Sequence, residues 1–221
     1  YSLDPKIQNI FERKGWSGEL KGIDGDFLSF GERTISGTKT GSYISRTLKK
    51  NSLIKDDGSV LVTLEFQREH TAEGELFRYY DPHFQGYNYL VSFDEVLFKV
   101  ALPRGSSIIE NPDKFALIEY EGPYDIYATT RRTDPSTTST LKLKYELPLK
   151  LANTGLISLN SLIRTPTGTF PIKLINCVDK PPSYQLVASS TNGLYKTSDT
   201  ETCYDKLITK DELMSFVYAK Q

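Results

Sequence analysis

The 221-residue sequence contains very few of the side chains on which most catalytic and metal sites depend. It has two histidines, two cysteines, one methionine and one tryptophan. Two histidines provide few ligands for zinc, and nucleophilic catalysis by a serine would require one of them beside that serine. For His70 and His83, a solvated or hydrogen-bonded surface position is more common than a catalytic role. We therefore expect a protein that is not an enzyme and that needs no metal or cofactor.

An excess of one charge and long apolar runs are also missing. Lys and Arg number 27 and Asp and Glu number 28, which gives a net charge of −1. Because nucleic-acid-binding proteins usually carry a basic excess, we expect no nucleic-acid partner. No apolar run approaches the ~20 residues of a membrane-spanning helix. The chain begins at Tyr1, so we expect a processed or trimmed N-terminus, and the localisation stays unknown.

The two cysteines, Cys177 and Cys203, are too far apart in the sequence for a paired zinc motif. They could form one disulfide that closes a loop of about 25 residues, worth roughly 3 kcal/mol. The alternative is two reduced thiols. A disulfide would favour an extracellular or particle-associated protein, because disulfides persist in oxidising surroundings.

A short amphipathic helix is predicted at each end of the chain. Asp4 is a good N-cap and Pro5 suits the first helical position, where its missing N–H costs nothing. At the other end, residues 209–212 (TKDE) form a capping box ahead of Leu213 and Phe216. Each helix would need a surface against which to bury its apolar face.

Between these helices the chain has the pattern of strands and turns. Asp57-Gly58 and Asn192-Gly193 are typical of tight hairpin turns. Residues 141–147 alternate between apolar and charged side chains, as in a strand with one buried face. Short strands at regular spacing predict a mainly β fold, an antiparallel sandwich or barrel, in a single domain over residues 1–221. The predicted turns join residues 52–55 to 60–66, residues 156–163 to 170–178, and residues 184–188 to 194–195. Lys180-Pro181-Pro182 is the one plausible boundary, and we do not expect it to separate domains.

Two segments allow more than one structure. The stretch from Phe93 to Leu102 follows a capping box and could be a helix, although its β-branched and aromatic residues favour a strand. A hairpin around residues 70–75 has two registers. A two-residue loop places Glu65 opposite Arg78, whereas a three-residue loop places Arg68 opposite Arg78.

Pairs of carboxylates could support hydrolysis of a glycosidic bond. Residues two apart on a strand share one face at ~7 Å, a separation within the range of inverting glycosidases. Alternating acids are also typical of the exposed face of any sheet, so this function ranks third. The clusters are Glu65, Glu69, Glu73 and Glu75; Asp24, Asp26 and Glu32; and Glu119 with Glu121.

The stretch from Phe77 to Phe93 is the most distinctive part of the sequence. It holds seven of the 25 Phe and Tyr residues (11 Phe and 14 Tyr). Tyrosine combines a large apolar ring with a hydroxyl that can stay hydrated, which suits a half-buried strand or a contact surface. As a contact surface it would bind a sugar ring, a planar ligand or a protein. The candidate binding residues are Tyr79, Tyr80, His83, Phe84, Tyr87 and Tyr89.

The order of elements resembles that of the calycin (lipocalin-like) family. This resemblance rests on a short first helix, many strands and a final helix. It also rests on the segment Lys14-Gly15-Trp16-Ser17-Gly18 before the first strand. The usual G-x-W spacing is not met, so the likeness implies a β-barrel layout and no functional residue.

These observations favour a structural or protein-interaction protein that binds a protein partner or itself. A subunit of a larger assembly, such as a viral or phage particle, would have this composition. The alternative is a β-barrel or sandwich that binds a glycan or a small apolar molecule, and the third possibility is a carboxylate-dependent glycosidase.

Overall fold

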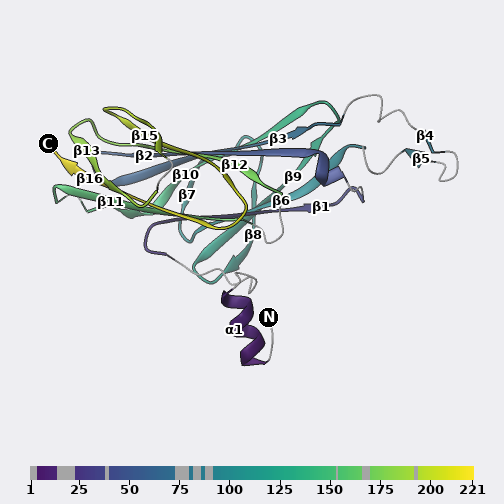
Figure 1. Cartoon of the computed structure of the whole chain (residues 1–221), viewed down its shortest axis with the longest axis horizontal. Coiled ribbons are helices and arrows are strands. Elements are labelled where there is room, and N and C mark those ends of the chain that lie inside the picture. The colour runs from purple at the N-terminus through teal and green to yellow at the C-terminus, as the bar shows by residue number, and fades with distance from the viewer. Residues whose placement is uncertain are drawn as a thin grey trace.

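Two β-sheets lie face to face in the computed structural model, which describes residues 4–13, 23–37, 40–72, 80–81, 86–87, 92–152, 154–165, 170–191 and 194–221 (Figure 1). The first sheet has the order β13 (Tyr184–Ser189), β16 (Glu212–Lys220), β11 (Leu156–Arg164), β1 (Asp26–Thr34), β6 (Asp94–Pro103), β9 (Tyr124–Thr133) and β8 (Ala116–Glu121). The second has the order β14 (Leu194–Thr197), β15 (Glu201–Ile208), β12 (Ile172–Asp179), β2 (Ile44–Ile54), β3 (Ser59–His70), β10 (Thr138–Lys150) and β7 (Ser107–Glu110). The remaining elements are the helix α1 (Pro5–Arg13), the 3₁₀ turn η1 (Thr40–Tyr43) and the small pair β4 (Tyr80–Asp81) and β5 (Gly86–Tyr87).

The prediction of a mainly β sandwich is confirmed, and the prediction of a purely antiparallel sheet is wrong. In the first sheet β1 pairs with β11 in parallel, and in the second β2 pairs with β12 in parallel. Both parallel pairs join an early strand to a late one, and such long-range pairings leave no local pattern in the sequence. The sheets do not close on themselves, so the barrel implied by the calycin resemblance is not formed.

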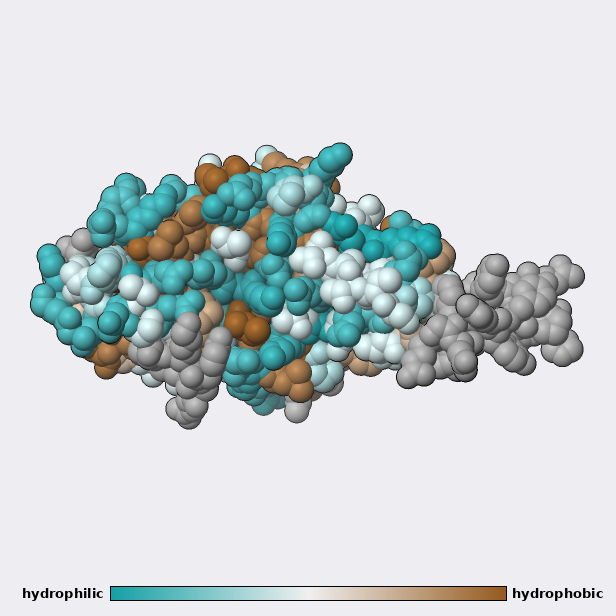
Figure 2. Space-filling model, turned by 90° about the horizontal axis from the view of Figure 1, so that it is seen from above, coloured by the Kyte–Doolittle hydropathy of each residue, from teal (hydrophilic) through white to brown (hydrophobic). Residues whose placement is uncertain are grey.

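Alternating side chains from both sheets form the core. In β10 the buried residues are Leu141, Leu143, Tyr145 and Leu147, which confirms the predicted alternation. β6 alternates in the same way, so the segment from Phe93 to Leu102 is a strand rather than a helix. Viewed from above in Figure 2, the molecule is mostly hydrophilic, with separate hydrophobic patches between the polar side chains.

One of the two predicted tight turns forms a hairpin and the other does not. Asp57-Gly58 joins β2 to β3, and Gly58 has φ +81°, a conformation that glycine adopts without strain. β13 and β14, which flank Asn192-Gly193, belong to different sheets. β13 pairs with β16 and β14 pairs with β15, so the predicted hairpin is not formed; Asn192 and Gly193 themselves lie outside the described residues. β11 and β12, which flank the turn predicted around residues 165–168, also belong to different sheets, and residues 166–168 lie outside the described residues.

The predicted hairpin around residues 70–75 is wrong in both registers. β3 lies between β2 and β10. Glu65 is opposite Lys49 on one side and Lys142 on the other, and Arg68 is opposite Arg46 and Ser139. Both sides of β3 are therefore already paired, and Arg78 lies outside the described residues. Glu65 forms favourable cross-strand ion pairs with these two lysines, in place of the pair with an arginine that one register of the hairpin predicted.

The N-terminal helix is confirmed and the C-terminal helix is wrong. Asp4 caps α1, since its Oδ1 accepts a hydrogen bond from the Lys6 N–H at 2.8 Å. The predicted covering surface is not seen: Ile7 and Ile10 are each 43% exposed, and Figure 1 shows α1 standing away from both sheets. The C-terminal segment is strand β16, whose backbone pairs with β11 and β13. Within the described residues, no helix has the length and apolar character to cross a membrane.

Charged side chains are buried between the two sheets at two places. Arg68 of β3 is fully buried and donates hydrogen bonds to Glu32 at 2.9 Å, to Thr133 at 2.8 Å and to Asp94. Lys50 of β2 and Asp26 of β1 form a second ion pair, with both side chains 0% exposed. Each cluster links the first sheet to the second through charge-assisted hydrogen bonds.

Candidate functional site

A recess of about 210 Å³ opens at the end of the sandwich that carries β13 and the turn between β14 and β15. Its walls are Lys180, Gln185, Leu186, Ser198 and Asp199. Lys180 follows β12 in the second sheet, whereas Gln185 and Leu186 belong to β13 in the first sheet. The recess therefore lies where the chain passes between the sheets.

Lys180 is the most unusual side chain of this recess, because it is a lysine only 4% exposed. Lysine is almost never fully buried unless it has partners. Its ammonium group donates a hydrogen bond to the backbone carbonyl of Asp199. The backbone N–H of Lys180 donates a second hydrogen bond, to the carbonyl oxygen of Thr200 at 2.9 Å. An ammonium group has three N–H donors, so Lys180 supplies a positive charge and donor capacity beyond the Asp199 contact.

The other walls are shaped by the turn from residue 198 to residue 201 and by one apolar side chain. Ser198 Oγ accepts the N–H of Glu201 at 3.0 Å, which fixes the turn. Leu186 packs partly buried against the main core. Gln185 and Asp199 are exposed at the recess. The lining thus combines one apolar wall, the neutral polar side chains of Gln185 and Ser198, the exposed acidic side chain of Asp199 and a buried cation, the mixture typical of a small-molecule site.

A disulfide ties together the two strands below the recess. Cys177 and Cys203 are directly paired between β12 and β15 and form an S–S bond, with their Cα atoms 4.1 Å apart. This confirms the disulfide and excludes the reduced alternative for this structure. Because Lys180 lies just beyond Cys177, the disulfide limits how far the strands carrying the recess can separate.

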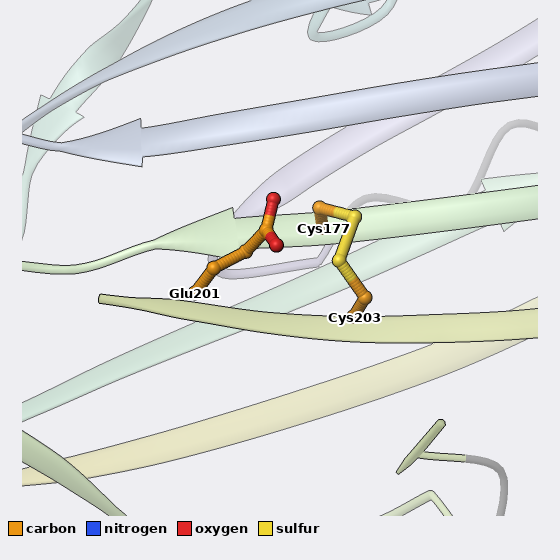
Figure 3. A group of neighbouring side chains, drawn as sticks. All are labelled: Cys177, Glu201 and Cys203. Carbon is orange, nitrogen blue, oxygen red and sulfur yellow. A yellow bond between two sulfur atoms is a disulfide. The ribbon is translucent and has the colours of Figure 1, made fainter. Parts of the chain in front are cut away.

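Glu201 lies beside the disulfide, as Figure 3 shows, and its carboxylate is within 4.8 Å of both sulfur positions. Two cysteines and a carboxylate could bind a metal if the cysteines were thiolates, since the thiolate is the metal-binding form. In the disulfide both sulfur atoms are already bonded to each other. The trio therefore does not provide a metal site in the oxidised protein.

The aromatic residues predicted as a binding surface are not tested by the structure. Tyr80 and Tyr87 are paired through their backbones in β4 and β5, and their side chains are not described. The other four candidates, Tyr79, His83, Phe84 and Tyr89, lie outside the described residues, as does Trp16.

His70 is hydrogen-bonded as expected, but it is buried rather than at the surface. It is 1% exposed, and its Nδ1 accepts the Ala72 N–H at 3.3 Å. Its Nε2 therefore donates to the carbonyl of Ser92 at 2.9 Å. Both ring nitrogens are used within the fold, which leaves neither one available for a substrate.

Three of the candidate carboxylates that the structure describes are held by cations, and Glu73 and Glu75 lie outside the described residues. Glu65 contacts Lys49 at 2.9 Å, and Glu32 contacts Arg46 at 3.0 Å. Asp26 is buried against Lys50, as described above. Glu119 and Glu121 are exposed on the edge strand β8. None of these carboxylates lines the Lys180 recess.

An interior cavity between the sheets is too small for a ligand. Its volume is about 10 Å³, and most of its lining is apolar, including Phe66, Phe98 and Phe115. A single water needs at least about 10–15 Å³ and several polar partners. The Lys180 recess is therefore the more suitable place for a solute.

Sequence reasoning missed the Lys180 recess because its walls come from separate segments. The local signal was Lys180 at the end of a strand and before two prolines, which indicated only a boundary. Nothing in the sequence shows that the segment from residue 198 to residue 201 folds against this lysine.

Comparison with known proteins shows the fold but no family. No family model and no curated protein matches the chain. A solved structure described as a "putative nutrient binding protein (lpg2210)" from Legionella pneumophila matches with a TM-score of 0.54 and 11% identity, over 88% of this chain and 71% of that one. An M1 zinc metallopeptidase from Deinococcus radiodurans matches at a TM-score of 0.36 and 13% identity, over 90% of this chain but 43% of the peptidase. At such identities the first likeness shows a shared fold, and the second is too low to support any argument.

Proposed function

We propose that the protein is a non-enzymatic binding protein that holds a small, negatively charged solute in the Lys180 recess. The observation that carries this proposal is the Lys180 ammonium group, 4% exposed at the wall of a recess of about 210 Å³. A carboxylate on the solute would accept hydrogen bonds from the ammonium group, and such charge-assisted bonds are strong away from bulk water. Leu186 would contact the apolar part of the solute.

The size of the recess limits the solute. Pockets for drug-sized molecules usually have volumes of about 300–1,000 Å³, and this recess is smaller. An amino acid, a hydroxy acid or a small dicarboxylate has the appropriate size and charge. A glycan chain or a large apolar ligand is disfavoured at this recess, because the recess is small and Leu186 is its one apolar lining residue.

Two further observations support binding of a solute. The fold is similar to that of the Legionella protein, which is described as binding a nutrient. The disulfide between Cys177 and Cys203 suits an oxidising compartment, where a protein can meet solutes from outside the cell. The proposal accordingly places the protein outside the reducing cytosol.

A thermal-shift screen followed by calorimetry tests this function. The panel contains amino acids, hydroxy acids, dicarboxylates, neutral sugars and simple amines. A ligand at one hundred times its Kd stabilises the folded state by about 2.7 kcal/mol, which raises Tm by about 5–10 °C for a chain of this size. We expect this shift from at least one small carboxylate and from no amine. If no carboxylate shifts Tm, the proposal is wrong.

Matched lysine variants locate the binding. Lys180→Met keeps most of the side-chain volume and removes the charge. Lys173→Met, also on the β12 segment, removes a lysine whose side chain is 54% exposed and which lies 3.7 Å from Asp205. We expect Lys180→Met to abolish carboxylate binding and Lys173→Met to leave the Kd unchanged. Equal carboxylate affinities for the two variants would show that Lys180 is not part of the binding site.

A second candidate function, self-association through an edge strand, rests on β8. This strand ends the first sheet, and all of its residues are exposed, including Leu117, Ile118 and Tyr120 at 43%, 48% and 65%. Edge strands with apolar side chains offer unpaired backbone groups to another chain. A second copy of this protein could pair with β8 in the manner of added-strand recognition.

Solution mass measurements test this second candidate. We expect a dimer whose population rises with protein concentration and falls in the Ile118→Lys variant, because charge on an edge strand opposes pairing. Leu213→Lys is the control, since Leu213 is 56% exposed on β16, which has neighbours on both sides. A strict monomer at high concentration would refute the candidate.

A further inference from the structure

Lys50 and Asp26 form an ion pair buried between the two sheets. Lys50 Nζ is 2.5 Å from Asp26 Oδ2, and both side chains are 0% exposed. Lys50 belongs to β2 of the second sheet and Asp26 to β1 of the first. Removing two charges from water costs several kcal/mol for each ion, so burial of this pair carries a large desolvation cost.

A carboxamide lies beside the same amine. Asn176 of β12 is directly opposite Lys50 in the parallel β2–β12 pairing, and it is 0% exposed. Its Oδ1 lies 3.4 Å from Lys50 Nζ. The amine also donates a hydrogen bond to Ser52 Oγ at 2.7 Å. It is therefore held among a carboxylate from the opposite sheet, a carboxamide from the neighbouring strand and a hydroxyl of its own strand.

The hydrogen bonding around this cluster is incomplete. Asp26 Oδ1 and the Tyr145 hydroxyl are buried and have no hydrogen-bond partner among the described residues. Burial, together with the nearby Asp26 carboxylate, raises the pKa of Tyr145. Buried polar groups without partners are rare in folded proteins and call for an explanation. A simple structural ion pair leaves both of these atoms unexplained.

We propose that Lys50 and Asn176 become joined by an intramolecular amide bond, which the folded protein forms itself with Asp26 as the proton carrier. This cross-link would connect β2 to β12 in the same sheet, across residues that are 126 positions apart in the chain. The proposal gives Lys50 and Asn176 a covalent role and Asp26 a role in proton transfer.

The reaction is balanced without an oxidant, a reductant or water. The Lys50 ammonium group gives one proton to Asp26 Oδ2 and becomes a neutral amine. The amine nitrogen attacks Cγ of Asn176, and a new C–N bond forms. A second proton passes from that nitrogen through Asp26 to Nδ2 of Asn176, the Cγ–Nδ2 bond breaks, and ammonia leaves. Asp26 keeps the first proton and remains as a neutral acid beside the new amide.

Burial favours this reaction in two ways. Holding the amine beside its electrophile converts a slow bimolecular reaction into an intramolecular one. Exclusion of water prevents hydrolysis from competing with attack by the amine. The product also removes both buried charges, because a neutral amide and a neutral acid replace the ammonium and the carboxylate.

Intact-mass spectrometry of the folded, disulfide-reduced wild-type protein tests the proposal. We expect a mass about 17 Da below that of the sequence, from the loss of one ammonia. Trypsin should then release one branched peptide that joins residues 50–55 to residues 174–196. The unchanged sequence mass would overturn the proposal. So would a loss of about 18 Da, which is the loss of water expected for a Lys50–Asp26 bond, or ammonia loss without the branched peptide.

Variants identify the reacting groups. Lys50→Met, Asn176→Ala and Asp26→Ala should each restore the full sequence mass, the last because the proton carrier is absent. Asn51→Ala is the control: Asn51 is the neighbour of Lys50 in the chain, and its amide donates to Asp179 at 2.8 Å. This control should keep the mass loss, and its disappearance there would contradict the assignment. The wild-type mass and branched peptide decide the question even where a variant fails to fold.

Discussion

Replacing Asp94 by alanine is expected to destabilise the protein severely, because this carboxylate neutralises a cation that has no access to water. The Arg68 guanidinium is 0% exposed and contacts Asp94, whose side chain is 1% exposed. Asp94 Oδ1 also accepts a hydrogen bond from Thr40 at 3.0 Å. Asp94→Ala removes both interactions, and it leaves Arg68 with Glu32 as its remaining carboxylate.

The size of the effect follows from burial. Removing one partner of a buried ion pair costs about 3–5 kcal/mol, because an uncompensated charge stays in the core. The net stability of a folded domain is only about 5–15 kcal/mol. We therefore expect Asp94→Ala to lose about 3–5 kcal/mol, which is a large fraction of the total. Urea unfolding followed by circular dichroism measures this loss as a lower midpoint.

Two controls separate the cost of leaving a buried charge unpaired from the cost of losing an exposed ion pair and from the cost of lost packing. Asp134→Ala removes an exposed ion pair, in which both side chains are 53% exposed, and it should cost less than about 1 kcal/mol. The double variant Arg68→Met with Asp94→Leu removes both charges, and it should recover most of the stability lost in Asp94→Ala. If Asp94→Ala costs no more than Asp134→Ala, the buried-pair reasoning is refuted. A double variant no more stable than Asp94→Ala would assign the loss to packing instead.

The remaining predictions concern the disulfide, a buried tyrosine and a turn. Replacing both Cys177 and Cys203 by alanine should cost about 3 kcal/mol by restoring loop entropy to the unfolded chain, and an unchanged melting temperature would contradict this. Burial raises the pKa of Tyr218 to about 12 from 10.0, so the folded state keeps its proton longer than the unfolded state does. The stability from Tyr218 is therefore complete below pH 10 and should fall by about 1.4 kcal/mol per pH unit up to about pH 12. Urea unfolding of Tyr218→Phe should show a loss between these pH values that is smaller than the wild-type loss by this amount. Gly58→Ala should cost more than Gly37→Ala: both glycines have positive φ, at +81° and +71°, but only at Gly58 would the new Cβ meet a backbone oxygen, at 2.4 Å. Equal unfolding midpoints for the two glycine variants would show that this close contact is relieved without cost.

Local sequence patterns predicted most individual strands and failed at the C-terminal helix. The TKDE capping box and the spacing of Leu213 and Phe216 indicated a helix. The same segment also alternates, with Met214, Phe216 and Tyr218 on one face, and in β16 these three residues are fully buried. β11 pairs with the segment from Glu212 to Ala219, and β13 pairs with its second half from Phe216 to Lys220. These tertiary contacts outweigh a local capping preference.

The buried charges could have been located from the sequence by extending the alternation of their strands. In β3, Val62, Leu64 and Phe66 share a face with Arg68, and Arg68 is as buried as they are. In β2, Leu48 shares its face with Lys50 in the same way. The period of two thus places both cations in the core. What it does not supply is their partners, because Glu32, Asp94 and Asp26 come from strands of the other sheet.

The low counts of cysteine, histidine and methionine left no evident catalytic motif, and the alternating apolar and polar residues by themselves determined a mainly β fold, sandwich or barrel. They also determined which face of each strand is buried, since side-chain alternation is a local property of the backbone. Only the tertiary structure decided the parallel pairings β1–β11 and β2–β12, the placement of β13 and β14 in different sheets, and the groups that meet around Lys180 and Lys50. The physical reason is that these contacts join residues distant in the chain, and their partners are chosen by the packing of whole sheets rather than by neighbouring residues.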